Sequence, residues 1–194
     1  MPNAPCRTIC WIPVWNKSWK GVGLEHLLLG ERVADSVVLA FDEERGPFRL
    51  TYRLTWDKGW RLHHAELSVA TEHFKRSLSL HTDDKGHWRK GDGQQLHELD
   101  GCVDVDIWPT PFTNSFPIRR EAMAVGERRQ FNVAWIFAPE LTVHRQSQAY
   151  TRLGDRLYLF ENLDGSGFTA KLPVDEDSIV LDYPDLFRRV REDG

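Results

Sequence analysis

Hydrophobic and polar residues alternate along most of the chain with a period of two, rather than the period of about 3.6 that marks a helix. The clearest run has apolar residues at every second position, namely Phe48, Leu50, Tyr52, Leu54 and Trp56. Because successive side chains of a strand point to opposite faces of its sheet, these residues share one face. The pattern predicts a strand with one buried face and one polar face.

Similar runs, bounded by Gly, Pro, Asn and Asp turn signals, predict further strands along the whole chain. They span 23–29, 33–41, 60–70, 74–80, 103–107, 128–137, 141–153, 156–162, 168–174 and, with a short closing element, 180–189. One short helix is expected within Thr113–Val125, where Asn114 or Ser115 could cap it and Pro117 could occupy its first turn. The sequence predicts a mainly β single domain of about 10–12 strands with one or two short helices.

Composition narrows the class of protein. The chain has 194 residues, 41% of them hydrophobic, so a single domain can build its own core. Its net charge of −4 is unlike the strongly basic balance of a nucleic-acid-binding domain. No apolar run is long enough for a membrane span, and the first residues lack the apolar block of a signal peptide. Three cysteines at unrelated spacings imply no disulfide framework. We expect a bacterial cytoplasmic protein whose oligomeric state the sequence leaves open.

Tryptophan is unusually frequent, with eight residues in the chain. Tryptophan favours positions that are apolar at one end and wet at the other, because its N–H needs a partner when buried. Two interpretations stay open: packing in a β-rich core, or the lining of a hydrophobic cavity. The eight residues are Trp11, Trp15, Trp19, Trp56, Trp60, Trp88, Trp108 and Trp135.

The densest polar segment is Leu99–Trp108, in which alternation places Cys102, Asp104 and Asp106 on one face. Aspartate is disfavoured in strands, so two on one face require an explanation. That face could be a hydrated edge. It could instead be buried, with Arg119 and Arg120 as the nearest partners for the carboxylates. A third possibility is that the same residues hold the polar head group of a ligand.

Motifs for other chemistry are missing or weak. The chain has no Gly-rich nucleotide loop, no G-x-S-x-G elbow and no H-E-x-x-H. Cys6 and Cys10 have no second pair to complete a zinc site, and one short stretch cannot bring the imidazole of His97 onto the thiol of Cys102. The spacing Asp104-x-Asp106 matches a metal-binding pattern too short to be specific. We expect no metal site, no cofactor and no catalytic residue.

The segment Leu99–Arg120, LDGCVDVDIWPTPFTNSFPIRR, resembles the hallmark of the family described as "putative glycolipid-binding". The segments 174–189, 23–27 and 52–57 are similar to other parts of that family, so the resemblance covers roughly 14–189. It implies a curled, incompletely closed antiparallel β-roll or half-barrel, similar to periplasmic lipoprotein carriers, with a concave apolar face for acyl chains. We therefore expect an N-terminal extension at 1–13 and one β-roll domain at 14–190. Those carriers are exported, and this chain shows no signal peptide, so the analogy extends only to the cavity.

Together these features favour a binding protein, rather than an enzyme, that holds a glycolipid or lipid in the concave face of the roll. Aromatic residues would supply apolar area, and a few polar groups near the mouth would orient a head group. One alternative is a small hydrolase or transferase that uses Asp104 and Asp106 as acid and base. Another is an interaction module that pairs through an open sheet edge. The residues expected to bind the ligand are Asp104, Asp106, Trp108, Phe112, Asn114, Phe116, Arg119 and Arg120.

Overall fold

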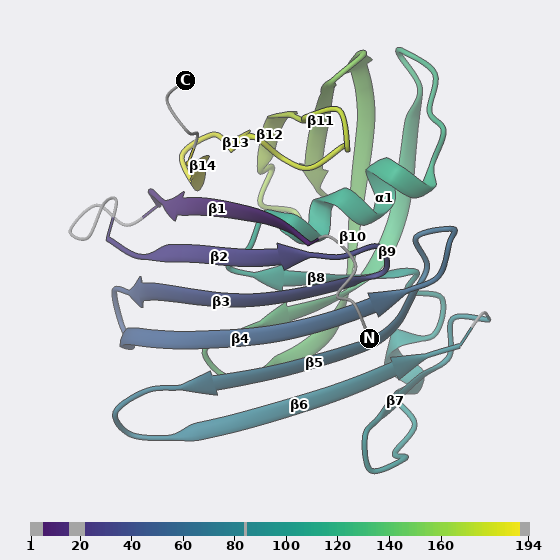
Figure 1. Cartoon of the computed structure of the whole chain (residues 1–194). Coiled ribbons are helices and arrows are strands. Elements are labelled where there is room, and N and C mark those ends of the chain that lie inside the picture. Colours follow the sequence, from purple (N-terminus) through teal and green to yellow (C-terminus); the bar gives the residue numbers. More distant parts are fainter. Residues whose placement is uncertain (1–5, 16–21, 84, 191–194) are drawn as a thin grey trace.

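The computed structural model describes residues 6–15, 22–83 and 85–190, and within them the chain forms two β-sheets (Figure 1). The larger sheet has nine strands in the order β13-β14-β1-β2-β3-β4-β5-β6-β7. Their bounds are β1 Arg7–Pro13, β2 Leu24–Leu29, β3 Val33–Asp42, β4 Gly46–Trp56, β5 Leu62–Ala70, β6 Lys75–Thr82, β7 Trp88–Lys90, β13 Asp182–Tyr183 and β14 Phe187–Arg189. From β1 to β7 each strand pairs antiparallel with the next one along the chain, as the alternating runs predict.

The smaller sheet has five strands among the described residues, in the order β12-β11-β10-β9-β8. Their bounds are β8 Asp104–Trp108, β9 Arg128–Phe137, β10 Thr142–Gly154, β11 Leu157–Asn162 and β12 Thr169–Pro173. Between β8 and β9 the chain forms the helix α1, Ser115–Arg120, preceded by the 3-10 turn Phe112–Asn114; a second 3-10 turn spans His97–Leu99. This helical segment connects the end of β8 to the opposite end of the sheet, where β9 begins. The strands β8 and β9 therefore run parallel, whereas the other pairs are antiparallel.

The fold class expected from the sequence is confirmed: the protein is a mainly β half-barrel in a single domain, with one short α-helix. Figure 1 shows β1–β6 side by side, β8 behind them and α1 above, with β9–β12 rising behind. The predicted alternation holds in β4, where the five apolar side chains from Phe48 to Trp56 are all buried. The predicted helix lies within its expected range and contains Pro117 in its first turn. Asn114 precedes it, although its side chain makes no capping hydrogen bond.

The amino-terminal strand departs from expectation. Residues 1–13 are predicted from the sequence to be an extension outside the domain, and for residues 7–13 the structure corrects this boundary; residues 1–5 lie outside the described residues. Arg7–Pro13 forms β1, which pairs with β2 on one side and β14 on the other. Trp11 is fully buried and donates from Nε1 to the carbonyl of Val180 at 2.9 Å. The strand was missed because its second partner, β14, comes from the far end of the chain.

The interior of the half-barrel is filled by the segment that follows β8. Phe112 and Phe116 are completely buried, with ring centroids 5.9 Å apart. They pack against Trp56 of β4, at centroid distances of 6.1 Å and 5.4 Å. The concave apolar face expected to hold acyl chains is therefore occupied, at this point, by the protein's own aromatic residues.

Tryptophans divide between core and partly exposed positions. Trp11, Trp56 and Trp88 are buried. Trp15, Trp60, Trp108 and Trp135 are half-buried, and Trp19 lies outside the described residues. The core interpretation of the tryptophan content thus applies to the buried members of the set.

Candidate functional site

A cavity of about 600 Å³ lies where the smaller sheet meets the β13–β14 end of the larger sheet. We call it the inter-sheet cavity. Its volume falls within the range of about 300–1,000 Å³ typical of small-molecule sites. Its aromatic lining consists of Trp108, Trp135, Phe160, Phe168, Tyr183 and Phe187. Its polar lining consists of Asp106, Thr110, Asn114, His144, Arg145, Gln146, Ser147, Gln148, Asn162 and Asp164.

Strand pairing brings the polar lining together. In the parallel pair β8–β9, Asp106 is the register partner of Trp135, which in turn faces His144 on β10. On β10 the alternation places Gln146 and Gln148 on the same face as His144. One face of the smaller sheet therefore presents a carboxylate, two amides and an indole to the cavity.

Asp106 is held by two neutral donors. Its Oδ1 accepts a hydrogen bond from the Thr113 hydroxyl at 2.9 Å, and its Oδ2 accepts one from the Gln148 amide at 2.6 Å. Burial raises the pKa of the Asp106 carboxyl, and the hydrogen bonds from Gln148 and Thr113 oppose that rise. Each oxygen keeps a further lone pair, so the carboxyl can still accept a hydrogen bond from a bound molecule.

Gln146 carries the clearest sign of a missing partner. Its Nε2 donates to Asn162 Oδ1 at 3.0 Å and approaches Asp164 Oδ2 at 3.5 Å, which fixes the orientation of the amide. Its Oε1 is buried and has no hydrogen-bond partner among the described residues. A buried acceptor left unpaired costs roughly 1–3 kcal/mol, so a donor supplied by a ligand or an ordered water would be stabilised here.

The buried carboxyl group of Glu25 lies next to the inner end of the cavity and accepts a hydrogen bond from a lining residue. Thr110, which lines the cavity, donates from its hydroxyl to Glu25 Oε1 at 2.8 Å. Glu25 is fully buried in β2, and its Oε1 also accepts hydrogen bonds from Tyr52 at 2.5 Å and Ser36 at 3.0 Å. Burial raises the pKa of Glu25 to about 7, although these hydrogen bonds lower it. The 109–114 segment is thereby tied to the larger sheet at the inner end of the cavity.

Aromatic contacts continue around the walls. Trp108 packs on Trp15 with ring centroids 4.8 Å apart, and Trp15 packs on Phe187 at 5.2 Å. Tyr183 contacts Phe160 and Phe168 at centroid distances of 6.1 Å and 6.2 Å. These rings offer large flat apolar surfaces beside the polar groups of β10, a combination suited to a ligand with both kinds of surface.

The residues predicted from the sequence separate into two groups in the structure. Asp106, Trp108 and Asn114 line the inter-sheet cavity. Asn114 is buried and accepts a hydrogen bond from the Tyr150 hydroxyl at 2.8 Å. Phe112 and Phe116 belong to the core and do not line the cavity.

Asp104 and Arg120 form a buried ion pair away from the cavity lining. Burial raises the pKa of Asp104, and the adjacent Arg120 guanidinium opposes the rise. Arg119 points elsewhere: its guanidinium stacks over Trp60 at 4.4 Å and donates to the backbone carbonyl of Asp177. Adjacent helical residues project about 100° apart, so only one of the two arginines can reach the strand. Of the three interpretations of the aspartates, burial against an arginine describes Asp104.

The β10 and β11 residues of the cavity were missed from the sequence. Gln146, Gln148 and Asn162 lie far along the chain from the 99–120 motif, and Tyr183 lies beyond them. The available signal was the polar alternation of β10, in which glutamines occupy positions that share a face with buried Tyr150. That signal indicates a polar patch on an inward face but not which segment it meets.

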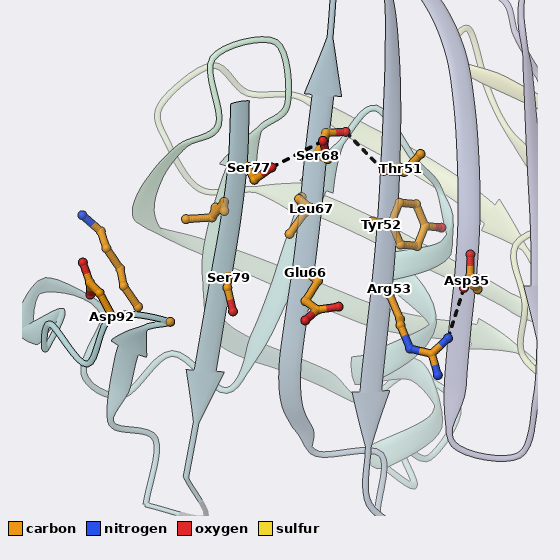
Figure 2. Close-up of a pocket in the computed structure, with 13 residues that line it drawn as sticks. Asp35, Thr51, Tyr52, Arg53, Glu66, Leu67, Ser68, Ser77, Ser79 and Asp92 are labelled. Atoms are coloured by element: carbon orange, nitrogen blue, oxygen red, sulfur yellow. Dashed lines mark hydrogen bonds and ion pairs between the residues drawn. The ribbon is translucent and has the colours of Figure 1, made fainter. Parts of the chain in front are cut away.

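A second hollow, of about 630 Å³, lies on the outer face of the larger sheet (Figure 2). Short hydroxyl side chains form its floor, with Thr51, Ser68 and Ser77 in one cross-strand row. Arg53 beside it is already paired with Asp35 at 3.1 Å, and both side chains are more than half exposed. This hollow has neither the enclosed acceptor nor the aromatic walls of the inter-sheet cavity, which is the better candidate site.

Two other kinds of feature are absent from the described part of the chain. No group of three His, Cys, Asp or Glu side chains is placed to hold a metal ion. Over the same residues, no helix has the length and apolar character needed to cross a membrane.

The fold and the cavity define a class: a β half-barrel whose two sheets enclose a pocket with polar and aromatic walls. The chain belongs to the family described as "putative glycolipid-binding", whose model matches residues 13–189. It is also similar to the crystal structure, at 1.80 Å resolution, of a DUF1089 family protein from Pseudomonas aeruginosa. The two chains are 49% identical with a TM-score of 0.84, over 86% of this chain and 91% of the other. A search of curated proteins found no match.

Proposed function

We propose that the protein binds an amphipathic small molecule of the glycolipid type in the inter-sheet cavity. The observation that carries this proposal is the buried, unpartnered oxygen of Gln146, a residue that lines a cavity walled by aromatic rings. An unpaired acceptor in such a place calls for a hydroxyl or amide donor from outside the chain. Trp108 and Trp135 offer the apolar surface that the remainder of an amphipathic ligand would cover.

The chemistry of the lining favours a head group rich in hydroxyls. Asp106 and Gln146 line the cavity, and hydroxyls are donors that suit both a carboxylate and an amide oxygen. The name of the matched family supports the same class of ligand, although it specifies no member of that class.

The site differs in position from the one predicted by sequence. A ligand in the open concave face would displace Phe112 and Phe116 from Trp56, whereas the inter-sheet cavity needs no such displacement. Of the predicted set, Asp106, Trp108 and Asn114 remain the residues proposed to bind it.

The experiment is a titration of tryptophan fluorescence with octyl glucoside, kept below its micellar concentration. Saturable binding is expected because Trp108 and Trp135 line the cavity. Gln146→Leu, which removes the unpaired oxygen at similar volume, should weaken binding about tenfold. Gln130→Leu is the matched control, since Gln130 is exposed on the neighbouring strand and does not line the cavity. A wild-type protein that gives no saturable change, and carries no co-purified lipid in native mass spectrometry, contradicts the proposal.

A further inference from the structure

We infer that Asp164 fixes which side of the Gln146 amide is left without a partner, and so makes the inter-sheet cavity select ligands that donate hydrogen bonds. This inference rests on the proposed function and adds a residue that determines specificity. Asp164 acts on Gln146 through Asn162, so its role is that of a positioning residue. All three residues line the cavity.

Asp164 is the fixed end of a chain of hydrogen bonds. An amide presents an oxygen on one side and an NH2 group on the other, whereas an ionised carboxylate only accepts hydrogen bonds. Hydrogen bonds from the Ser166 hydroxyl and the Ser166 amide hold the pKa of Asp164 below its ordinary value, which keeps this carboxylate ionised at neutral pH. Its Oδ2 therefore needs the NH2 side of Asn162, and Asn162 Nδ2 donates to it at 2.8 Å.

Asn162 passes this orientation on to Gln146. Because Asn162 Nδ2 is engaged with Asp164, Asn162 Oδ1 is left to accept a hydrogen bond from Gln146 Nε2, at 3.0 Å. Gln146 Nε2 also approaches Asp164 Oδ2 at 3.5 Å, which favours the same orientation. The Gln146 amide is thereby left with its oxygen free, and this Oε1 is the atom that is buried without a partner among the described residues.

The Ser166 amide determines what a change at Asp164 would do. It donates to Asp164 Oδ1 at 2.8 Å, so an amide side chain at position 164 would keep its oxygen there and turn its NH2 group toward Asn162. Two NH2 groups would then face each other, so Asn162 would reverse, and Gln146 would reverse in turn. The unpartnered atom of Gln146 would become Nε2, which needs an acceptor from the ligand instead of a donor.

The test measures ligand preference in wild type and in Asp164→Asn by tryptophan fluorescence. The probes are octyl glucoside and its tetra-O-methyl derivative, in which every hydroxyl is replaced by an ether that accepts hydrogen bonds but cannot donate them. Wild type should prefer octyl glucoside. In Asp164→Asn the ratio of the two dissociation constants should shift toward the methylated probe by about tenfold. The bulk of the methyl groups affects both proteins equally and cancels from this comparison.

Asp155→Asn is the matched control for the loss of one negative charge. The Asp155 side chain is 97% exposed and does not line the cavity. Its replacement should leave the ratio of the two dissociation constants at the wild-type value. An equal shift in Asp155→Asn and Asp164→Asn would trace the change to charge alone and would overturn the inference.

A second measurement reads the amide orientation without a ligand. In wild type, NMR should give nuclear Overhauser contacts from the Asn162 amide protons to Asp164, and in Asp164→Asn from the same protons to Gln146. Unchanged contacts would overturn the inference, because Asn162 would not have reversed. It is also overturned if Asn162 reverses and the preference between the probes stays the same. If neither probe binds the wild-type protein, the proposed function itself fails, and ligand selection by Gln146 fails with it.

Discussion

Arg120 in α1 reaches back to β8 and forms an ion pair with Asp104 in which both side chains are almost completely buried. Arg120 also donates to Glu121 at 3.1 Å, and its guanidinium lies 5.5 Å from the Phe131 ring centroid. The contact joins the two ends of the segment that fills the half-barrel, so its removal should affect folding more than binding.

We expect Asp104→Ala to lower the free energy of unfolding by about 3–5 kcal/mol, because it leaves the Arg120 guanidinium buried without its partner. Urea denaturation measures the change. The control is Asp35→Ala, which removes a partner of Arg53 at a site where both side chains are more than half exposed and should cost under ~1 kcal/mol. Equal stability of the two variants would place Asp104 in a solvated environment, contrary to its burial.

The buried Glu25 should make the protein less stable as pH rises. Its pKa is about 7 in the folded protein against 4.5 for an ordinary glutamate. Between these two pKa values the folded chain holds a proton on Glu25 that the unfolded chain has lost. The contribution of Glu25 to the free energy of unfolding is therefore greatest below pH 4.5 and falls as pH rises to 7. The loss is on the order of 3 kcal/mol.

The measurement is urea denaturation of wild type and Glu25→Gln between pH 5 and pH 8. The amide carries no charge, so the stability difference, wild type minus variant, should decline over this range. Asp104 and Asp106, whose pKa values burial also raises, are present in both proteins and cancel from the difference. Parallel pH curves would show that Glu25 does not titrate with a raised pKa.

Phe116 tests whether the aromatic filling of the half-barrel is structural. Phe116→Ala leaves a cavity against Trp56, Trp60 and Phe112 and should cost about 3–5 kcal/mol. Phe168→Ala removes the same ring from the mouth of the inter-sheet cavity, where partial exposure limits the expected cost to ~1 kcal/mol. Thermal denaturation distinguishes them, and a larger shift for Phe168→Ala would contradict the assignment of core and mouth.

Gly23, at the start of β2, should not tolerate a side chain. Its φ is +124°, and an added Cβ would lie 2.3 Å from the Leu39 carbonyl oxygen. Gly23→Ala is therefore expected to cost about 1–3 kcal/mol in urea denaturation. Gly154→Ala is the control, since an added Cβ there meets nothing within 4 Å. If Gly154→Ala proved the more damaging change, the close approach of β2 and β3 at Gly23 would be incorrect.

Local pattern determined most of the secondary structure. The apolar alternation from Phe48 to Trp56 fixed both the strand and its buried face, because strand geometry alone decides which side chains share a face. The helix at Ser115–Arg120 was likewise predictable, since Pro117 suits a first helical turn. The 99–120 motif also indicated the half-barrel through its resemblance to a family.

Tertiary structure decided what sequence pattern could not. Strand β1 depended on pairing with β14, at the other end of the chain, which no local pattern reports. The choice of Arg120 rather than Arg119 as the partner of Asp104 depended on the direction in which a short helix projects each side chain. The candidate site depended on packing between two sheets, which brings Gln146 to Asp106 and Tyr183 around a single cavity. The sequence determined the faces of the strands, and long-range packing determined which faces meet and where space remains between them.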